Sequence, residues 1–565
     1  MILLNPKRLS QRYPDGRSLE VMASTIDFFE KKGKKRLKED AHQRVWYDDF
    51  LKFVKDEKIF ATLLTPPNYG GADSRWDTFR NVAFNEILGF YGLPYWYTWQ
   101  VTTLGLGPIW MSGNEEAKRR AAQLLKNGAV FAFGLSERQH GADIYSTEMT
   151  LTPQPDGSYI ANGEKYYIGN GNVAPMISTF GKMADSGEYV FFAADSTNPH
   201  FELLGNVCDS QNYVSTFALH DYPIGEAEIL SKGREAWDSA LNTVNICKFN
   251  LGAASIGIST HAFYEAINHA ANRRLYGIYV TDFPHVKQMF TDAYARLAAM
   301  KLFTLRAADY VRVASPNDRR YLLYNSVVKM KVTTQGVEVI DLLWDVIAAK
   351  GFEKDMYFES AATDIRALPK LEGTVHVNIA LILKFMANYF FNPTEYANIG
   401  QRSEAKNDDY LFQQGPAKGM GDIQFHDYNT AYSDWDLPNV NVFREQTSVF
   451  SEMLAVAPPD ESQSRDTDFI LTVGEIFTLV AYGQLILENA RICDVPADVV
   501  DQIFDCFVRD FSKFALQLYS KPRCNPGQSS YCLKMIRRPV VNDERYGRVW
   551  RDYVHALKDA YEMNP

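Results

Sequence analysis

A polar loop with two glycines, Phe133-Gly-Leu-Ser-Glu-Arg-Gln-His-Gly-Ala-Asp143, is the first stretch whose residue types could do chemistry. It follows an apolar run, and small residues beside turn-forming glycines let backbone amides approach a ligand closely. A second candidate is Glu372, a carboxylate directly before Gly373 and Thr374 that could act as a general base. Residue types alone leave both open, because the loop could be an ordinary surface loop and Glu372 a solvated side chain.

Short β-prone runs surround the loop and form the element that must position it. Residues 158–161 and 164–168 flank Asn162-Gly163, and Asn-Gly favours the type I′ turn of a β-hairpin. Two further turns are indicated. Pro155-Asp156-Gly157 follows a β-prone run at residues 147–152, and Asp185-Ser186-Gly187 precedes another at residues 188–194. The sequence therefore predicts an island of β-structure between two long helical blocks.

Helical periodicity marks both sides of this island. Residues 1 to about 130 are helical in pattern, and the chain returns to helix near Gly233. One apolar helical stripe is formed by Val286, Met289, Phe290, Ala293 and Leu297. A polar connecting segment runs from Asn392 to about Asp434, and helical patterns follow it.

Composition excludes several functional classes. The net charge of −10 argues against a nucleic-acid binder held by phosphate contacts. Six cysteines contain no C-x-x-C pair and the histidines no H-E-x-x-H spacing, so no metal site is predicted. The apolar run near Val377–Phe391 contains Lys384 and is too short to span a bilayer. Because the start also lacks the pattern of a signal peptide or presequence, we expect a cytoplasmic protein without an integral membrane segment.

Several motifs together resemble a known family. Ser136-Glu137 with His140-Gly-Ala-Asp143, followed by Asn162-Gly-Glu-Lys165 and Asn170-Gly171, is similar to the flavin-binding signature of the acyl-CoA dehydrogenase family, which includes an acyl-CoA oxidase branch. Two later segments extend the resemblance, namely Arg273-Arg-Leu-Tyr-Gly277 and Leu371-Glu-Gly-Thr374. The tail after the polar connecting segment lies outside the family's common core.

The resemblance implies a mainly α fold with a central β-domain. The expected parts are an N-terminal helical domain (1–130), a β-barrel-like middle domain (131–232), a four-helix bundle carrying the catalytic base (233–395), and a linker with a C-terminal helical domain (396–565), as in the longer members of the family.

It also implies FAD-dependent α,β-dehydrogenation of an acyl-CoA thioester to the trans-2-enoyl-CoA in lipid metabolism. Glu372 matches the family's base, which removes the α-proton while the β-hydrogen leaves as hydride to flavin N5. Carried over residue by residue, the FAD-binding positions are Phe133, Leu135, Ser136, Gly141, Ala142, Tyr167, Ile168, Gly169, Arg273, Thr374 and His376, and the substrate-binding positions are Ala142, Lys248 and Gly373.

The chain departs from the family pattern at several of these positions. Ala142 replaces a serine, and Tyr167 replaces the tryptophan that covers the flavin. Gly169 replaces the threonine whose hydroxyl hydrogen-bonds N5, and a glycine there is found in the oxidase branch. Ala348-Ala-Lys-Gly351 stands where Gly-Gly-Asn-Gly is usual. Lys248 stands where an arginine near the CoA moiety is common, with an ordinary surface lysine as the alternative.

Partners follow from the same resemblance. An electron-transferring flavoprotein is the expected acceptor, and Arg273 matches the arginine that reaches the FAD of a neighbouring subunit, so a homodimer is expected, with a tetramer as the alternative. An acyl-CoA oxidase that uses O2 stays open as a second function. A relative without catalytic activity that serves as a binding or scaffold protein is a third, disfavoured by Glu372 and Arg273. A flavin monooxygenase is disfavoured because those enzymes usually lack the carboxylate base.

Overall fold

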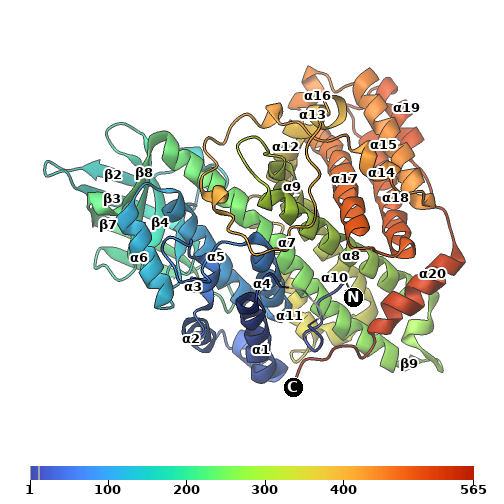
Figure 1. The fold of residues 1–565 in the computed structure, drawn as a ribbon, viewed down its shortest axis with the longest axis horizontal. Helices are drawn as coiled ribbons and strands as arrows, with labels where there is room; N and C mark the ends of the chain where they lie inside the picture. Colours follow the sequence, from blue (N-terminus) through green and yellow to red (C-terminus); the bar gives the residue numbers. More distant parts are fainter. Residues whose placement is uncertain (1, 10–12) are drawn as a thin grey trace. The chain divides into compact units, whose positions relative to one another are not determined.

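The computed structural model describes residues 2–9 and 13–565 and is mostly helical (Figure 1). Within these residues, an eight-stranded sheet and a two-stranded hairpin are the β-structure. The predicted class, mainly α with a central β-domain and additional C-terminal helices, is confirmed.

The described chain forms two compact units. One, called unit 2 below, comprises residues 13–250, 403–418 and 563–565, and the other, unit 1, comprises residues 2–9, 251–402 and 419–562. The units cut across the four ranges expected from the sequence, so the boundaries at residues 130, 232 and 395 stay predictions.

Unit 2 begins with a block of helices. They are α1 (Gly16–His42), α2 (Asp48–Asp56), α3 (Ile59–Leu64), α4 (Thr78–Tyr91), α5 (Leu93–Met111) and α6 (Glu115–Lys126). Asp15 and Asn114 accept backbone N–H groups of the first turns of α1 and α6, as capping residues do. All residues of α5 are buried except Pro94 and Met111, which explains its apolar and aromatic composition as that of a core helix.

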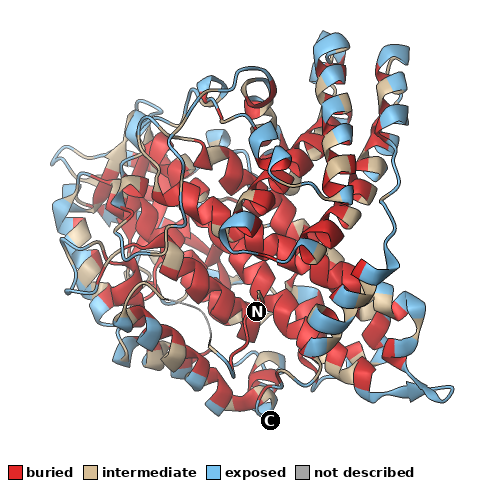
Figure 2. Cartoon of the chain, turned by 45° about the vertical axis from the view of Figure 1, so that its right-hand side comes forward, coloured by how far each residue is buried: buried red, intermediate tan, exposed pale blue. Residues whose placement is uncertain are grey.

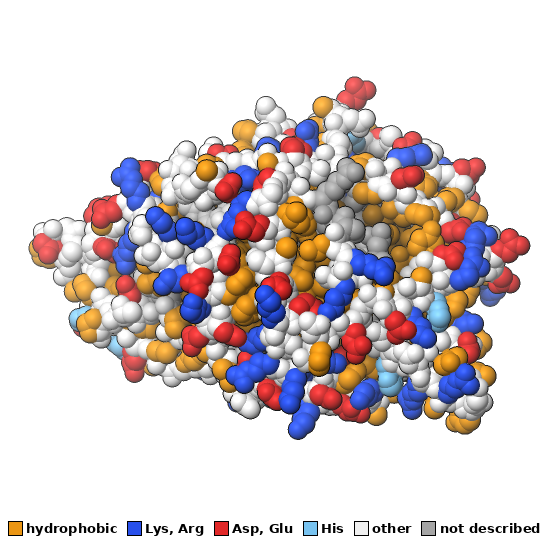
Figure 3. Space-filling view, turned by 60° about the horizontal axis from the view of Figure 1, so that its bottom comes forward, with side chains coloured by type: hydrophobic (Ala, Val, Ile, Leu, Met, Phe, Trp, Pro, Cys, Tyr) orange, Lys and Arg blue, Asp and Glu red, His pale blue; other side chains and the backbone are white. Residues whose placement is uncertain are grey.

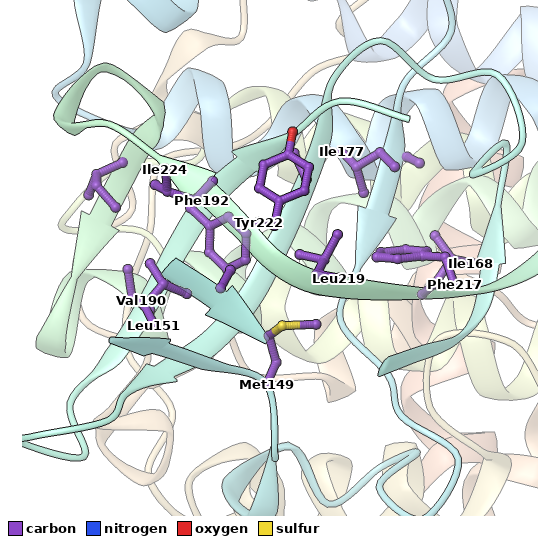
Figure 4. Packing of buried hydrophobic residues seen from close by; sticks show 14 of the residues in the cluster. Met149, Leu151, Ile168, Ile177, Val190, Phe192, Phe217, Leu219, Tyr222 and Ile224 are labelled. Atoms are coloured by element: carbon purple, nitrogen blue, oxygen red, sulfur yellow. The ribbon is translucent and has the colours of Figure 1, made fainter. Parts of the chain in front are cut away.

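The eight-stranded sheet follows. Its strands are β1 (Ala132–Gly134), β2 (Thr150–Pro153), β3 (Tyr159–Gly169), β4 (Ile177–Met183), β5 (Tyr189–Ala194), β6 (Phe201–Asn206), β7 (Val214–Ile224) and β8 (Ile229–Lys232). The order is β6-β7-β3-β2-β4-β5-β8, with β1 parallel to β4. Met149, Phe192, Phe217 and Leu219 belong to the buried cluster that these strands enclose (Figure 4).

The hairpin predicted at Asn162-Gly163 is wrong. β3 runs unbroken through these residues, which form a β-bulge against β7. Gly163 has φ +142°, and a Cβ there would lie 3.0 Å from Met149 Cα, so glycine is required by close strand packing. The Asn162 side chain spans the strands, donating to Asp221 Oδ1 (3.1 Å) and accepting from Asp221 N (2.9 Å). Asn-Gly therefore serves a bulge here and not a turn.

The other two predicted turns are confirmed. Gly157 has φ +86°, and Gln154 and Ser158 close the turn between β2 and β3. Gly187 has φ +72° in the turn that joins β4 to its antiparallel neighbour β5.

Unit 1 is built on long helices. Helix α7 (Gly233–Asn272) begins in unit 2 and ends in unit 1. It is followed by the hairpin β9 (Arg274–Leu275) and β10 (Ile278–Tyr279), and then by α8 (Pro284–Arg312), α9 (Tyr321–Val327), a π-helical segment (Val328–Val332), α10 (Thr333–Ile347), α11 (Tyr357–Asp364), α12 (Val375–Ile382) and α13 (Met386–Phe391). The apolar stripe predicted on α8 is buried, apart from the half-buried Met289.

The C-terminal helices are α14 (Asn429–Ser433), α15 (Pro438–Val456), α16 (Glu461–Arg465), α17 (Thr467–Ile492), α18 (Ala497–Tyr519), α19 (Pro526–Met535) and α20 (Asp543–Val549). Two of them, α17 and α18, pack against α8. Arg296 of α8 donates to both carboxylate oxygens of Asp510 on α18, at 2.6 and 2.8 Å. A bidentate, largely buried pair of this kind fixes the register of the two helices.

Helix α17, and not Val377–Phe391, is the most membrane-like segment of the described chain. It is long and apolar enough to cross a bilayer, but 83% of its most apolar window is buried inside the protein, as in the core helix of a globular unit. Figure 2 shows such burial, in red, along the long helices.

Candidate active site

The loop predicted to bind the flavin leaves the sheet at β1 and is held against β3. Glu137 and His140 exchange two backbone hydrogen bonds of 3.1 Å, which close a tight turn. Ser136 Oγ donates to Tyr166 O at 2.7 Å, and Tyr166 N donates back to Ser136 O at 3.0 Å. Phe133 is buried, with its ring 5.9 Å from that of Phe191, so it anchors the start of the loop.

A buried ion pair fixes the middle of this loop. Lys165 of β3 is fully buried, and its Nζ donates to Glu137 Oε1 (2.7 Å), Leu135 O (3.0 Å) and Thr147 Oγ1 (3.2 Å). Burial lowers the pKa of Lys165 to about 8, against the opposing effect of the Glu137 charge. Lys165 therefore connects the loop to the sheet through both a side chain and a backbone carbonyl.

Glu137 is held by a full set of donors. Besides Lys165, it accepts from the amides of Glu148 (2.7 Å) and Met149 (3.2 Å) and from the Thr147 hydroxyl. Burial alone would raise its pKa, but Lys165 and these donors keep the pKa of Glu137 below its ordinary value. His140 and Glu148 place ligand atoms within 4.8 Å of Glu137, yet we assign the three no metal because the Glu137 oxygens are already engaged.

The outer part of the loop has donors available for a ligand. Within the chain that the structure describes, the amides of Ser136, Gly141 and Ala142 donate to no acceptor. A Cβ built on Gly141 would meet no atom within 4 Å, so the space beside this glycine is open. Adjacent free amides suit an anionic or carbonyl-rich group, and these residues thus fit the flavin role expected of them.

Tyr167 interrupts the regular course of β3. It has φ +63°, lies at a register shift between Tyr166 and Ile168, and is 60% exposed, whereas Ile168 is buried. Positive φ is uncommon for an aromatic residue. It strains the backbone, so the surrounding structure must hold Tyr167 in this conformation. The bulge turns a large ring outward from the sheet, as a residue that covers a bound aromatic ligand requires.

Asn170, which was not expected to be a site residue, locks the end of β3 to α5. Its backbone has φ +60°, and its fully buried side chain donates to Thr98 O, Thr102 Oγ1 and Phe131 O at 3.1–3.3 Å while accepting from Thr98 Oγ1 at 3.0 Å. The Asn170-Gly171 motif was the available signal, but only the structure shows that this amide fixes helix, strand and loop together.

The carboxylate predicted to be the base lies in unit 1, in the loop before α12. Glu372 has φ +53° and Gly373 φ +88°, and both are half-buried. Thr374 is the N-cap of α12 and accepts from Val377 N at 3.4 Å, whereas Asn378 Nδ2 donates to Gly373 O (3.3 Å) and Thr374 O (2.9 Å). Several hydrogen bonds therefore fix this loop, and they keep Glu372 in a conformation that an unconstrained glutamate avoids.

A buried lysine of the π-helical segment supports the chain just before this loop. Lys329 is fully buried in the π-helical segment, and its Nζ donates to Leu368 O at 2.8 Å. Leu368 lies four residues before Glu372 and is itself buried. π-helical turns inside α-helices are rare, but they are common at functional sites. This one places the amino group of Lys329 beside the segment that leads to Glu372.

The departure at Ala348 stores backbone strain. Ala348 has φ +54° and ψ −137°, a region that glycine adopts without cost. We expect Ala348→Gly to stabilise the protein by about 1 kcal/mol, because relief of roughly 1–3 kcal/mol of strain exceeds the entropic cost of a glycine, about 0.5–1 kcal/mol. Chemical denaturation would measure this. Ala349→Gly, at a neighbouring residue without positive φ, is the control and should destabilise.

Arg273 and Lys248 differ in exposure. Arg273 is exposed at the base of the β9–β10 hairpin, where its carbonyl accepts from Val280 N at 2.9 Å. At the tip, Tyr276 has φ +52° and is 96% exposed. Lys248 on α7 is only 4% exposed, so the alternative of an ordinary surface lysine is wrong.

The structure divides the predicted residues between the units. Unit 2 contains Phe133, Leu135, Ser136, Gly141, Ala142, Tyr167, Ile168, Gly169 and Lys248, and the loop and the end of β3 bring all but Lys248 together. Unit 1 contains Arg273, Glu372, Gly373, Thr374 and His376, of which Thr374 and His376 are exposed beside the base. Basic and acidic side chains are intermixed on the face seen in Figure 3, without a stripe of positive charge.

Comparison with known proteins shows similarity to acyl-CoA dehydrogenases. Residues 235–387, which include Arg273 and Glu372, match the family model of the acyl-CoA dehydrogenase C-terminal domain. An acyl-CoA dehydrogenase of Bacillus subtilis (strain 168) is 24% identical over 292 residues, 50% of this chain and 76% of that relative. The short-chain specific acyl-CoA dehydrogenase of Megasphaera elsdenii is 24% identical over 367 residues, 62% of this chain and 93% of that relative.

Solved structures extend the likeness to the C-terminal helices. An acyl-CoA dehydrogenase complexed with FAD from Bacillus anthracis has a TM-score of 0.75 at 16% identity, covering 98% of this chain and 97% of that chain. Butyryl-CoA dehydrogenase from Megasphaera elsdenii has a TM-score of 0.58 at 19% identity, covering 66% of this chain and 98% of its own. The resemblance to the acyl-CoA dehydrogenase family is confirmed, and the fold is shared across nearly the whole chain.

Proposed function

We propose that this chain is an FAD-dependent acyl-CoA dehydrogenase that converts an acyl-CoA thioester into its trans-2-enoyl-CoA. The observation that carries the proposal is Glu372, held at φ +53° by the Thr374 cap and Asn378 within the segment that matches the family model. A strained carboxylate that the surrounding structure holds in place is the kind of group that general-base chemistry needs.

Each residue has a distinct role in this proposal. The bound flavin supplies a hydride acceptor. Glu372 takes the α-proton of the acyl group on a carboxylate oxygen. The amides of Ser136, Gly141 and Ala142 bind polar atoms of the cofactor, and Tyr167 covers its ring. Arg273 binds phosphate groups of the FAD of a second copy, for which its exposed guanidinium is suited, so the active form is a homodimer.

The first test is cofactor loading. We expect the purified protein to carry about one non-covalent FAD per chain, since each chain has one Ser136–Asp143 loop and one bulge at Tyr167. Arg273→Ala should weaken FAD binding by roughly 10–100-fold, because a hydrogen bond to a charged group contributes about 1.5–3 kcal/mol. Fluorescence titration of the apoprotein with FAD measures both, and Arg274→Ala, whose guanidinium stacks on Tyr279, is the matched control. An apoprotein that FAD cannot turn yellow would overturn the proposal.

An acyl-CoA oxidase is the second candidate, favoured by Gly169, because that position lacks the hydroxyl of the dehydrogenase pattern. We favour a dehydrogenase that passes electrons to an electron-transferring flavoprotein, since Ser136-Glu137 and Asn170-Gly171 resemble the motifs of the dehydrogenase branch. The two differ in how the reduced protein returns to the oxidised form. If protein reduced anaerobically by its substrate re-oxidises in air much faster than with a dye acceptor, the oxidase assignment replaces ours.

A further inference from the structure

The residue at the end of β3 has no room for a side chain, because a tyrosine of α5 fills the space. Gly169 is buried, and a Cβ built on it would lie 2.6 Å from Tyr97 Cε1 and 2.7 Å from Val101 Cγ1. Real Cβ atoms do not approach other atoms so closely, and both neighbours belong to one buried helix. Glycine at position 169 is therefore a consequence of the way α5 packs on the strand.

The same tyrosine brings a hydroxyl to this position. Tyr97 Oη lies 3.0 Å from the point where a Cβ of residue 169 would be, so it occupies the neighbourhood that a hydroxyl carried by residue 169 would reach. Its position is fixed, because Asn170 ties the strand to Thr98 and Thr102 on the same helix. Tyr97 itself is buried, with 7% of its surface exposed.

Two features connect the Gly169 position with the residues expected to bind the flavin, namely the Ser136–Asp143 loop and Tyr167, which together we call the flavin cradle. Tyr167, the exposed ring of the bulge, lies two residues before Gly169 on β3. Ser136, whose amide is available to a ligand, is hydrogen-bonded to Tyr166 of the same strand. A tyrosine combines an apolar ring, which suits the protein core, with one O–H group that can form a hydrogen bond.

We propose that Tyr97 is a flavin-contact residue, and that its hydroxyl donates a hydrogen bond to the edge of the isoalloxazine ring next to Gly169. The contact that a threonine at position 169 would make is thereby supplied from α5 across the strand. This inference rests on the proposed function, since it requires that the cradle binds a flavin.

The test is FAD binding and the visible spectrum of the bound flavin in full-length Tyr97→Phe. Removal of one neutral hydrogen bond should weaken FAD binding by about 2–10-fold, and the flavin absorption bands should shift because the ring edge loses a donor. Tyr95→Phe is the matched control, since Tyr95 lies on the same helix but packs on Phe29 and Phe50. It should leave FAD affinity and spectrum unchanged.

A relocation variant makes the result specific. Tyr97→Ala and Val101→Ala combined with Gly169→Thr remove both side chains that block residue 169 and return a hydroxyl on the strand, so this variant should restore the parent spectrum, whereas Tyr97→Ala with Val101→Ala alone should not. If Tyr97→Phe binds FAD with parent affinity and an unshifted spectrum, the inference is wrong while the proposed function stands. If the parent protein takes up no FAD, both are overturned.

Discussion

Glu372→Gln should lose roughly 10²–10⁴-fold or more of the rate of flavin reduction by acyl-CoA, since this is the range that a positioned general base contributes. Glutamine keeps the size and hydrogen-bonding reach of the side chain but has no basic carboxylate. Fold and FAD content should survive, because hydrogen bonds of Thr374 and Asn378 hold the loop. Stopped-flow measurement of flavin bleaching would give the rate directly.

The control for this variant is Glu353→Gln. Glu353 lies in the same unit, is exposed, and pairs only at the surface with Lys350, so its loss should leave the bleaching rate within a factor of two or so. If Glu372→Gln bleaches within a factor of a few of the parent rate, Glu372 is not the base. A carboxylate elsewhere would then have to be sought.

Lys165→Met should destabilise the protein by about 3–5 kcal/mol, which is the usual cost of removing one partner of a buried ion pair. Glu137 would remain buried without its cation, and Leu135 O would lose a donor at the point where the loop meets the sheet. Urea denaturation would measure the change. Lys52→Met, which removes one partner of an exposed pair with Asp56, should change stability by no more than about 0.5 kcal/mol.

A double-mutant cycle isolates the pair. Combined with Glu137→Gln, Lys165→Met should cost less than the sum of the single variants, with a coupling of about 1–3 kcal/mol. The cycle would contradict the assigned role if the two effects simply add, or if Lys165→Met costs no more than Lys52→Met.

The pH dependence of the pair has a defined sign. The pKa of Lys165 is lowered from 10.5 to about 8 by burial, so between these values the unfolded chain binds the proton that the folded chain has released. Lys165 therefore makes the free energy of unfolding rise with pH through this window. The variant Lys165→Met lacks this group. Subtracting its curve of unfolding free energy against pH from that of the parent protein should therefore leave the rise that Lys165 causes.

The residues of the candidate site could be selected from the sequence because they lie in short motifs, and their roles stay predictions. The Ser136–Asp143 loop, the outward Tyr167 and the Glu372-Gly373 turn are local features, and the structure gives each of them special backbone geometry or free donors. The turns at Gly157 and Gly187 were equally predictable, since glycine supplies the positive φ that they need.

The features that could not be predicted depend on contacts between segments far apart in the sequence. Asn162-Gly163 has the composition of a turn, but close packing of Gly163 on Met149 and the bonds of Asn162 to Asp221 make it a bulge. Similarly, Gly169 could be noted as a departure, but the ring of Tyr97, seventy-two positions earlier in the chain, is what explains it. Tertiary packing of this kind is not encoded in local periodicity.

Anaerobic titration of the FAD-loaded protein with acyl-CoAs of increasing chain length tests the central claim most directly. The account predicts that at least one acyl-CoA bleaches the flavin and that trans-2-enoyl-CoA forms in an amount equal to the flavin reduced. If dithionite bleaches the same flavin but acyl-CoAs from short to very long chains do not, the chain is not an acyl-CoA dehydrogenase.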